Sequence, residues 1–320
     1  MAVVALRREE PDRGKSAVDA SMASRLDEVF DNPLRTTDVE LLTIRDLTVR
    51  FGGLTALSAV NIDVGHHDLV SIIGPNGAGK TTTLNAICQL IKCTGEIHFA
   101  GRRIDRLAAW RIAAAGIGRS FQDPPLIDHY TVLENVLCGA HQRLRYGMLH
   151  QVFWPPRVRR FEARMARRAM TLLDFVGLAD QAGKDAGSLS FGARKLVDIA
   201  RAMVSGPRLL LLDEPSSGLD EAERHSLRAI LLALRQEKRV GILTVDHHMD
   251  LVRSTATHVV ALQAGEVLMA GSPAEVLDSA RFRVAIVGGS RADEKLAAEL
   301  PNEPPPSDND TGDGGREEEL

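Results

Sequence analysis

The chain has 320 residues, of which 44% are hydrophobic and 26% are charged, and its net charge is -4 at pH 7. This balance is typical of a globular protein with one large or two small domains, and the mild acidity does not favour nucleic-acid binding. Three scattered cysteines without a CxxC pair disfavour a zinc site or a disulfide framework. Because no apolar run approaches the roughly 18 to 20 residues of a membrane-spanning helix, we expect a cytoplasmic protein that reaches a membrane only by docking on another chain.

The predicted elements begin after a polar, aperiodic segment, residues 1–40, which we expect to be disordered. The tail, residues 289–320, is rich in proline, glycine and acids, and we expect it to be disordered as well. Between these segments we predict a domain of residues 41–288 in which strands and helices alternate. The strands are predicted at 40–51, 69–73, 95–104 (two short strands joined by Ala100-Gly101), 208–215, 240–247 and 258–271 (a hairpin turning at Ala264-Gly265).

Several of these strands are continuous apolar runs, which are typical of a parallel sheet covered on both faces. The middle of the chain, about residues 126–204, differs because its pattern is helical. The sequence therefore predicts an α/β core with an inserted helical subdomain. A helix predicted at 161–179 carries apolar side chains along one face, at Met165, Ala169, Leu172, Leu173 and Val176.

A glycine-rich stretch, "IGPNGAGKTT" at residues 73–82, follows the strand predicted at 69–73 and precedes a helix predicted at 80–91. It matches G-x-x-x-x-G-K-[ST], the phosphate-binding P-loop. Glycines let successive N–H groups close on an anion where a Cβ would obstruct them, and the helix N-terminus adds partial positive charge. The alternative is an ordinary strand-to-helix turn with a chance lysine, which the flanking strand and helix disfavour. The residues expected to hold a nucleotide are Gly74, Pro75, Asn76, Gly77, Ala78, Gly79, Lys80, Thr81 and Thr82.

Two acids end another apolar run, "LLLLDEP" at residues 209–215. Ligands of open α/β sheets bind beyond the carboxyl ends of the strands. We therefore expect Asp213 to bind Mg²⁺ with the Thr81 hydroxyl, while Lys80 reaches the β- and γ-phosphates. Strand alternation directs Glu214 elsewhere, where its carboxylate can accept a proton from an attacking water. The alternative, an acid pair at a helix start, is the weaker reading in a chain that also has a P-loop.

Further motifs follow in a fixed order: "SFQ" (120–122), "LSFGARK" (189–195), "SSGLD" (216–220) and "VDHHM" (245–249). Together with the P-loop and "LLLLDEP", this set resembles the ATP-binding cassette (ABC) ATPases over about residues 41–288. The resemblance implies an α/β P-loop NTPase (RecA-like) core with an antiparallel β subdomain and an inserted α-helical subdomain. It also implies an ATPase that uses ATP and Mg²⁺.

The resemblance assigns roles by position in this sequence. Gln122 is similar to the Q-loop glutamine, which acts in catalysis and at Mg²⁺, and Glu214 to the catalytic carboxylate. His247 is similar to the switch histidine, with His248 as the competing choice. The nucleotide-binding residues that it adds are Phe51 (stacking on adenine, or alternatively a plain packing aromatic), Ser190 and Gly192 (the signature) and Asp220 (the D-loop). Ala193 stands where the signature of the family has glutamine, and we expect this departure to weaken dimer closure without abolishing activity.

Finer features resemble the ATPase subunits of branched-chain amino acid importers: "FGGLTAL", "GIGRSFQ", "YTVLENV" and the basic stretch 157–168. That stretch is either a solvated helix face or a face near anionic lipid headgroups. The resemblance implies transmembrane permease subunits, a second ABC ATPase subunit, identical or related, and an extracytoplasmic substrate-binding protein as partners. It implies no nucleic acid, and it places the chain peripherally on the cytoplasmic face of the cell membrane. The alternatives are another cargo (urea or short amides, or lipopolysaccharide export), a soluble non-transport ABC ATPase, and a non-hydrolysing interaction module.

Overall fold

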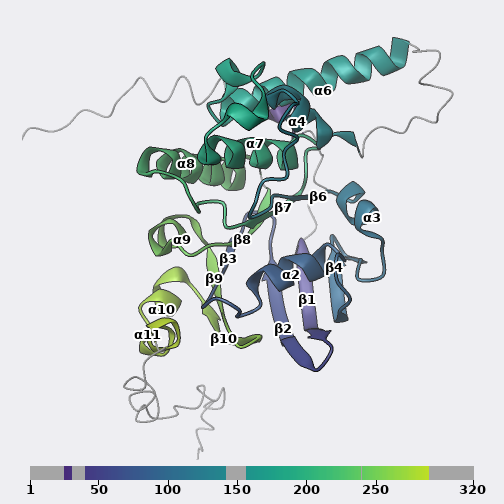
Figure 1. Cartoon of the computed structure of the whole chain (residues 1–320). Coiled ribbons are helices and arrows are strands. Elements are labelled where there is room, and N and C mark those ends of the chain that lie inside the picture. The colour runs from purple at the N-terminus through teal and green to yellow at the C-terminus, as the bar shows by residue number, and fades with distance from the viewer. Residues whose placement is uncertain (1–24, 31–39, 142–155, 239, 288–320) are drawn as a thin grey trace, which may run out of the picture.

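The computed structural model describes residues 25–30, 40–141, 156–238 and 240–287. Its central sheet has six strands in the order β10-β9-β3-β8-β7-β6, all parallel except the edge strand β10 (Figure 1). Every residue of β3, β7 and β8 is buried, which explains why these strands are continuous apolar runs. The strands are β3 (Leu69–Ile73), β6 (Ile117–Arg119), β7 (Leu209–Asp213), β8 (Gly241–Val245), β9 (His258–Gln263) and β10 (Glu266–Gly271).

A second, antiparallel sheet has the strand order β2-β1-β4-β5. The predicted turn at Ala100-Gly101 is present, with φ angles of 48° and 73°. Side chains of this sheet and of the central sheet, among them Ile44 and Ile72, meet in one buried apolar cluster that includes Leu84 of α2. The strands are β1 (Leu42–Phe51), β2 (Leu54–Val64), β4 (Thr94–Phe99) and β5 (Arg102–Arg103).

A helical part lies between β6 and β7 in the sequence and at the top of Figure 1, away from the antiparallel sheet. It contains α4 (Val132–Cys138), α6 (Pro156–Phe175), α7 (Phe191–Met203) and the 3₁₀ turns η2 (Ala179–Gln181) and η3 (Ala186–Ser188). The apolar face predicted for the helix at 161–179 is buried: four of its side chains lie on α6 and the fifth, Val176, follows the helix directly, and all five are at most 4% exposed. The helix ends at Phe175, before the predicted residue 179, and Gly177 follows with a φ of 75°.

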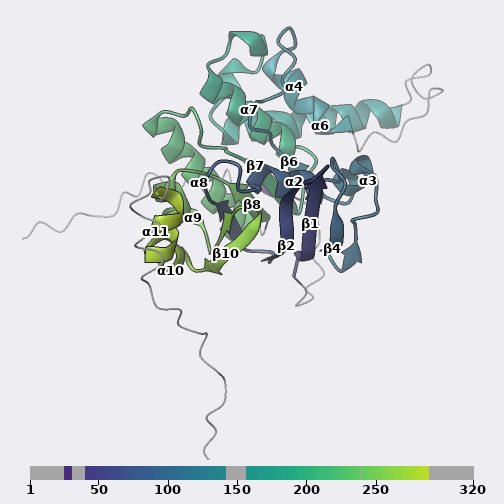
Figure 2. The same ribbon diagram turned by 60° about the horizontal axis from the view of Figure 1, so that its bottom comes forward.

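The other helices cover the two sheets. Figures 1 and 2 both place α3 on one side of the molecule and α9, α10 and α11 on the opposite side. In the described part of the chain, no helix has both the length and the apolarity needed to cross a membrane. The helices that cover the sheets are α2 (Lys80–Ile87), α3 (Ala109–Ala114), α8 (Glu221–Lys238), α9 (Met249–Thr255), α10 (Pro273–Leu277) and α11 (Ala280–Val287).

Besides the end of α6, two further expectations are wrong in detail. Helix α2 ends at Ile87 rather than at residue 91 because Gln89 adopts a left-handed φ of 53°, and Leu90 is consequently 52% exposed. Residues 25–30, expected to be disordered, include a helical turn whose Leu26 and Val29 are each 1% exposed in the core of the helical part. The remainder of the predicted N-terminal disorder and the tail 289–320 lie outside the described residues.

Candidate functional site

The glycine-rich loop connects β3 to α2 at the carboxyl end of the central sheet. Gly74, Gly77 and Gly79 have φ angles of 147°, 79° and 101°, which L side chains rarely adopt. A Cβ at Gly74 would lie 2.2 Å from the backbone oxygen of Leu262, and one at Gly79 would lie 2.5 Å from a methyl carbon of Leu57. Gly74 and Gly79 are therefore required both by the backbone conformation of the loop and by its close packing, whereas Gly77 is required by its backbone conformation alone, because an added Cβ there would meet nothing within 4 Å.

Lys80, the first residue of α2, is only 6% exposed. Its Nζ donates hydrogen bonds to the backbone oxygens of Gly74 and Pro75, both at 2.9 Å. Burial lowers the pKa of Lys80, whereas the carboxylates of Glu214 and Asp213 act to raise it. The loop thus encloses the Lys80 amine, and the negative charges of Glu214 and Asp213 act on it.

A hydroxyl and a carboxylate meet beside the loop. Thr81 Oγ1 donates to Asp213 Oδ1 at 3.1 Å, and Asp213 is 2% exposed at the end of β7. Burial raises the pKa of Asp213, while the hydrogen bond from Thr81 and the guanidinium of Arg119 lower it. Among the described residues no group of three or more His, Cys, Asp or Glu side chains could hold a metal ion. One carboxylate and one hydroxyl nevertheless fit Mg²⁺, which usually takes few protein ligands and completes its shell with phosphate oxygens and water.

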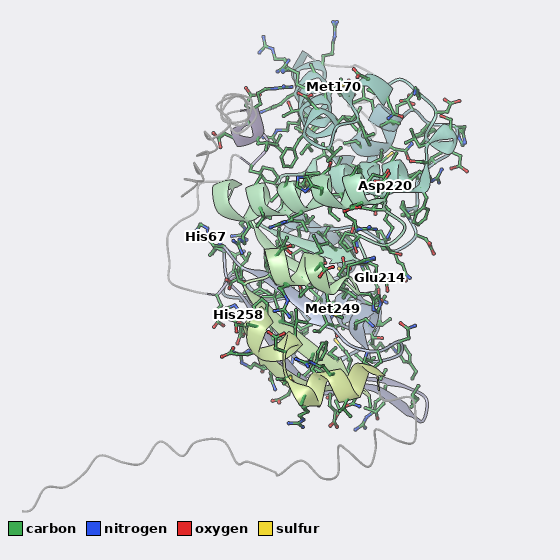
Figure 3. All side chains as sticks on the ribbon, turned by 90° about the vertical axis from the view of Figure 1, so that its left-hand side faces the viewer. His67, Met170, Glu214, Asp220, Met249 and His258 are labelled. Carbon is green, nitrogen blue, oxygen red and sulfur yellow. The ribbon has the colours of Figure 1, made fainter. Side chains whose placement is uncertain are left out.

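The three predicted catalytic residues, Gln122, Glu214 and His247, meet at Glu214, which Figure 3 labels between Asp220 and Met249. Gln122 Nε2 donates to Glu214 Oε2 at 3.1 Å, and His247 Nε2 lies 2.9 Å from Glu214 Oε1. The backbone of Glu214 has a left-handed φ of 48°, which turns the chain sharply so that Asp213 and Glu214 reach different partners. Between the two candidate histidines, His247 is the one at the carboxylate, because His248 Nδ1 instead lies 2.6 Å from Ser216 Oγ.

Comparison with known proteins decides the family. Residues 57–217 match the ABC transporter family. The chain is 38% identical over 240 residues to the high-affinity branched-chain amino acid transport ATP-binding protein BraF of Pseudomonas aeruginosa, an alignment that spans 75% of this chain and 94% of BraF.

The chain belongs to the ABC transporter family.

Other relatives and solved structures agree with this assignment. LivG of Escherichia coli K12, a protein of the same description as BraF, is 36% identical over 74% of this chain and 93% of LivG. The phosphonates import ATP-binding protein PhnC of Wolinella succinogenes is also 36% identical, over 74% of this chain and 85% of PhnC.

Two solved ABC cassettes share the fold. One, in its ADP conformation, has a TM-score of 0.67 and 30% identity over 79% of this chain and 100% of its own. Another, a dimer in a post-hydrolysis state bound to ADP and Pi, has a TM-score of 0.63 and 28% identity over 72% of this chain and 98% of its own. The chain is thus an ABC ATPase whose P-loop NTPase fold carries an antiparallel β subdomain and an inserted helical subdomain.

The residues predicted to form the signature and the D-loop, Ser190, Gly192 and Asp220, make up a second group around the starts of α7 and α8. Ser190 is the N-cap of α7 and accepts a hydrogen bond from Ala193 N at 3.2 Å. Gly192 lies against α8, since a Cβ there would be 2.3 Å from a carboxylate oxygen of Glu223. Asp220 caps α8 by accepting from Glu223 N at 2.7 Å. Within the described residues no hydrogen bond joins Ser190, Gly192 or Asp220 to the P-loop.

Phe51 ends β1 and is 51% exposed, so its ring is free to stack on a flat ligand. The adenine-stacking role of Phe51 stays a prediction. Sequence reasoning also missed two buried cations at the site. Arg119 Nη2 lies 3.7 Å from Asp213 Oδ2, and Lys195 Nζ donates to the backbone oxygen of Glu214. No local pattern in the sequence indicates the contact of Arg119, which depends on the pairing of β6 with β7. Lys195 lies one helical turn beyond Phe191 of the motif LSFGARK, and this position was the one available signal for it.

Proposed function

We propose that this cassette is the ATP-hydrolysing subunit of a branched-chain amino acid importer. The observation that supports branched-chain amino acids as the transported substrate is the extent of the alignments: the chain matches 94% of BraF and 93% of LivG but 85% of PhnC. The identities alone, 38%, 36% and 36%, do not separate the cargo classes. The motifs "FGGLTAL" and "YTVLENV" support the same class.

The loop and Phe51 account for nucleotide binding in this proposal. The loop N–H groups and the N-terminus of α2 surround the phosphates of ATP, and Lys80 contributes a positive charge from beneath the loop. The half-exposed ring of Phe51 stacks on adenine. Thr81 and Asp213 would hold Mg²⁺, with Gln122 close by, and the ion would neutralise charge on the β- and γ-phosphates.

Glu214 is the general base of the proposed hydrolysis. It takes a proton from a water molecule while the water oxygen bonds to the γ-phosphorus, and the bond from that phosphorus to the β–γ bridging oxygen breaks. Gln122 and His247 contact different oxygens of the carboxylate, at 3.1 Å and 2.9 Å, and so fix its orientation. General-base catalysis contributes about 10²- to 10⁴-fold to the rate.

A second cassette completes each ATP site. Ser190, Gly192 and Asp220 have no hydrogen bond to the P-loop among the described residues of their own chain, and the related cassette bound to ADP and Pi is a dimer. We infer that the signature of one subunit closes on the nucleotide of the other. Closure is then linked to ATP binding. The partner is a second copy or a related cassette.

The permease subunits dock in a groove between α3 and the helical part. This groove has a volume of about 460 Å³ and includes three exposed apolar side chains, Leu90, Trp110 and Phe121. Phe121 directly precedes Gln122 in the chain, so a permease helix in this groove would contact the neighbour of a residue that binds Glu214. The cassette then sits peripherally on the cytoplasmic face of the membrane, and an extracytoplasmic substrate-binding protein delivers the amino acid. Nucleic acid has no part in the cycle.

Reconstituted transport tests this proposal. The cassette, its permease subunits and the binding protein are assembled in proteoliposomes, and ATP-dependent uptake of radiolabelled leucine, urea and a phosphonate is compared. The matched control is the same complex with Glu214→Gln. We expect leucine uptake that the control lacks. Uptake of urea or phosphonate without leucine would contradict the cargo, and ATP hydrolysis without uptake of any solute would contradict the transport role.

A further inference from the structure

Helix α7 carries a buried lysine directly behind the catalytic carboxylate. Lys195 is 2% exposed, and its Nζ donates a hydrogen bond to the backbone carbonyl oxygen of Glu214. The ring of Phe191, one turn earlier on the same helix, lies 5.5 Å from the ammonium. A charged donor to a backbone carbonyl is stronger than a neutral one, and burial protects this contact from screening by salt.

The carbonyl that Lys195 contacts belongs to a peptide in an unusual conformation. Glu214 has a φ of 48° without being glycine, and such residues persist only where their surroundings hold them in place. The conformation of this residue directs its carboxylate to Gln122 and His247. A group that fixes the carbonyl of Glu214 therefore also restricts the direction of its side chain.

Helix α7 also anchors the segment that carries Gln122, the hydrogen-bond partner of Glu214. Asp198, one turn beyond Lys195 and 1% exposed, accepts a hydrogen bond from the backbone N–H of Phe121 at 2.8 Å. Phe121 is the neighbour of Gln122, whose amide donates to Glu214 at 3.1 Å. Two charged side chains of α7 thus anchor the backbone on both sides of the Gln122–Glu214 hydrogen bond.

In the proposed dimer, the first turn of α7 faces the ATP bound by the partner subunit, whereas Glu214 acts on the ATP bound by its own chain. The turn begins at the N-cap Ser190, which in the proposed dimer faces the nucleotide of the partner subunit. Phe191 packs on the D-loop, because a Cβ at Gly218 would lie 2.6 Å from its ring. One rigid helix therefore spans the distance between the signature and the catalytic carboxylate of the same chain.

We propose that Lys195 is a positioning residue for ATP hydrolysis, which orients Glu214 through its backbone and ties that orientation to the signature end of α7. The coupling between the two ATP sites rests on the dimer proposed above, whereas the positioning role requires only the ATPase. Lys195 touches no substrate atom and acts through Glu214. It would therefore affect the rate of the chemical step more than the binding of ATP.

A simpler role for Lys195 is to neutralise the carboxylates around it. The groups whose charges act on it are Glu214, Asp246, Asp213 and Asp123. In that case its removal would lower the stability of the fold, but the folded fraction would hydrolyse ATP at the normal rate. The two roles thus predict different results for turnover per folded molecule.

The test compares Lys195→Met, which keeps the length of the side chain but removes the charge and the donor, with Lys195→Arg, which keeps both. The matched control is Lys184→Met, at an exposed lysine of the helical part. For each full-length variant we would measure kcat, the affinity for a fluorescent ATP analogue, the Hill coefficient for ATP in hydrolysis and the melting temperature.

We expect Lys195→Met to lower kcat at least tenfold with ATP affinity within threefold of wild type, and to bring the Hill coefficient from above 1 to about 1. Lys195→Arg should recover most of kcat, and Lys184→Met should match the wild type. An unchanged kcat per folded molecule in Lys195→Met, with or without a lower melting temperature, would overturn the positioning role.

If Lys195→Met does not fold, Lys195→Gln replaces it, because that variant keeps a neutral donor and is expected to be intermediate. Wild-type kcat in Lys195→Gln would then overturn the positioning role. An equal Hill coefficient in wild type and variant would overturn the coupling between sites. Because none of these assays includes a permease or a cargo, their outcome is separate from that of the leucine-uptake experiment.

Discussion

Replacing Lys80 by methionine removes the positive charge beneath the phosphate-binding loop. In the structure Nζ is buried and within 2.9 Å of the Gly74 and Pro75 carbonyl oxygens, so its contact with phosphate would be shielded from water. A hydrogen bond to a charged group contributes about 1.5 to 3 kcal/mol, which corresponds to roughly a ten- to hundredfold loss of ATP affinity.

The fold should tolerate this change. Burial lowers the pKa of Lys80, so the folded state disfavours its charged form. A group with a lowered amine pKa costs stability at neutral pH, and that cost disappears above its ordinary pKa of 10.5. Methionine removes this cost while it also removes two hydrogen bonds, and the opposing effects should leave the melting temperature close to that of the wild type.

Titration with a fluorescent ATP analogue measures the affinity, and thermal unfolding checks the fold. Lys92→Met, at an exposed lysine of the same part of the chain, is the matched control and should bind ATP normally. Unchanged affinity in a folded Lys80→Met variant would refute the reasoning, because the loop would then not hold the phosphates through this amine.

Three further predictions concern the loop, the histidines and the buried acid. Gly74→Ala should lower stability in urea unfolding by more than about 1 kcal/mol, because its φ is 147° and a Cβ would lie 2.2 Å from a backbone oxygen. Gly53→Ala, in open space, should cost much less, and equal losses would contradict the close packing. His247→Ala should slow steady-state ATP hydrolysis more than His248→Ala does, because His247 contacts Glu214 and His248 contacts Ser216. A larger loss of hydrolysis in His248→Ala would instead make His248 the switch histidine. Asp213→Asn should raise the melting temperature at pH 7, because burial raises the pKa of this carboxyl and its ionised form therefore lowers the stability of the fold above that pKa. This gain in melting temperature should vanish as the pH falls toward 3.8, the ordinary pKa of the carboxyl. A gain that does not depend on pH would contradict the burial of a charged carboxylate as its cause.

The sequence predicted the parts of the site that are local in the chain. The strand at Leu69–Ile73, the glycine loop and the helix that starts at Lys80 follow from a short motif and an apolar run. The burial of the α6 stripe followed from helical periodicity in the same way. Each of these features depends on neighbours within a few residues, which is why a single sequence was enough.

Other features depend on contacts between distant segments. Arg119 reaches Asp213 only because β6 pairs with β7, and Lys195 reaches Glu214 only because α7 packs behind it. The buried turn at Leu26 has too few apolar residues to signal a helix before its partners in the helical part are known. The adenine-stacking role of Phe51 stays a prediction for another reason: its ring is 51% exposed, and its proposed partner is a ligand and not a part of the chain.

The measurement that tests the central claim most directly is ATP hydrolysis by Glu214→Gln. This variant keeps the size and the hydrogen-bonding shape of the side chain but removes the basic carboxylate, while Lys80, Thr81 and Asp213 remain to bind the nucleotide. We predict a fall in turnover of about 10²- to 10⁴-fold with ATP binding retained, and a shift to dimer with Mg-ATP, but not with Mg-ADP, in size-exclusion chromatography. Wild-type hydrolysis by the variant would contradict the account, because Glu214 would then not be the general base.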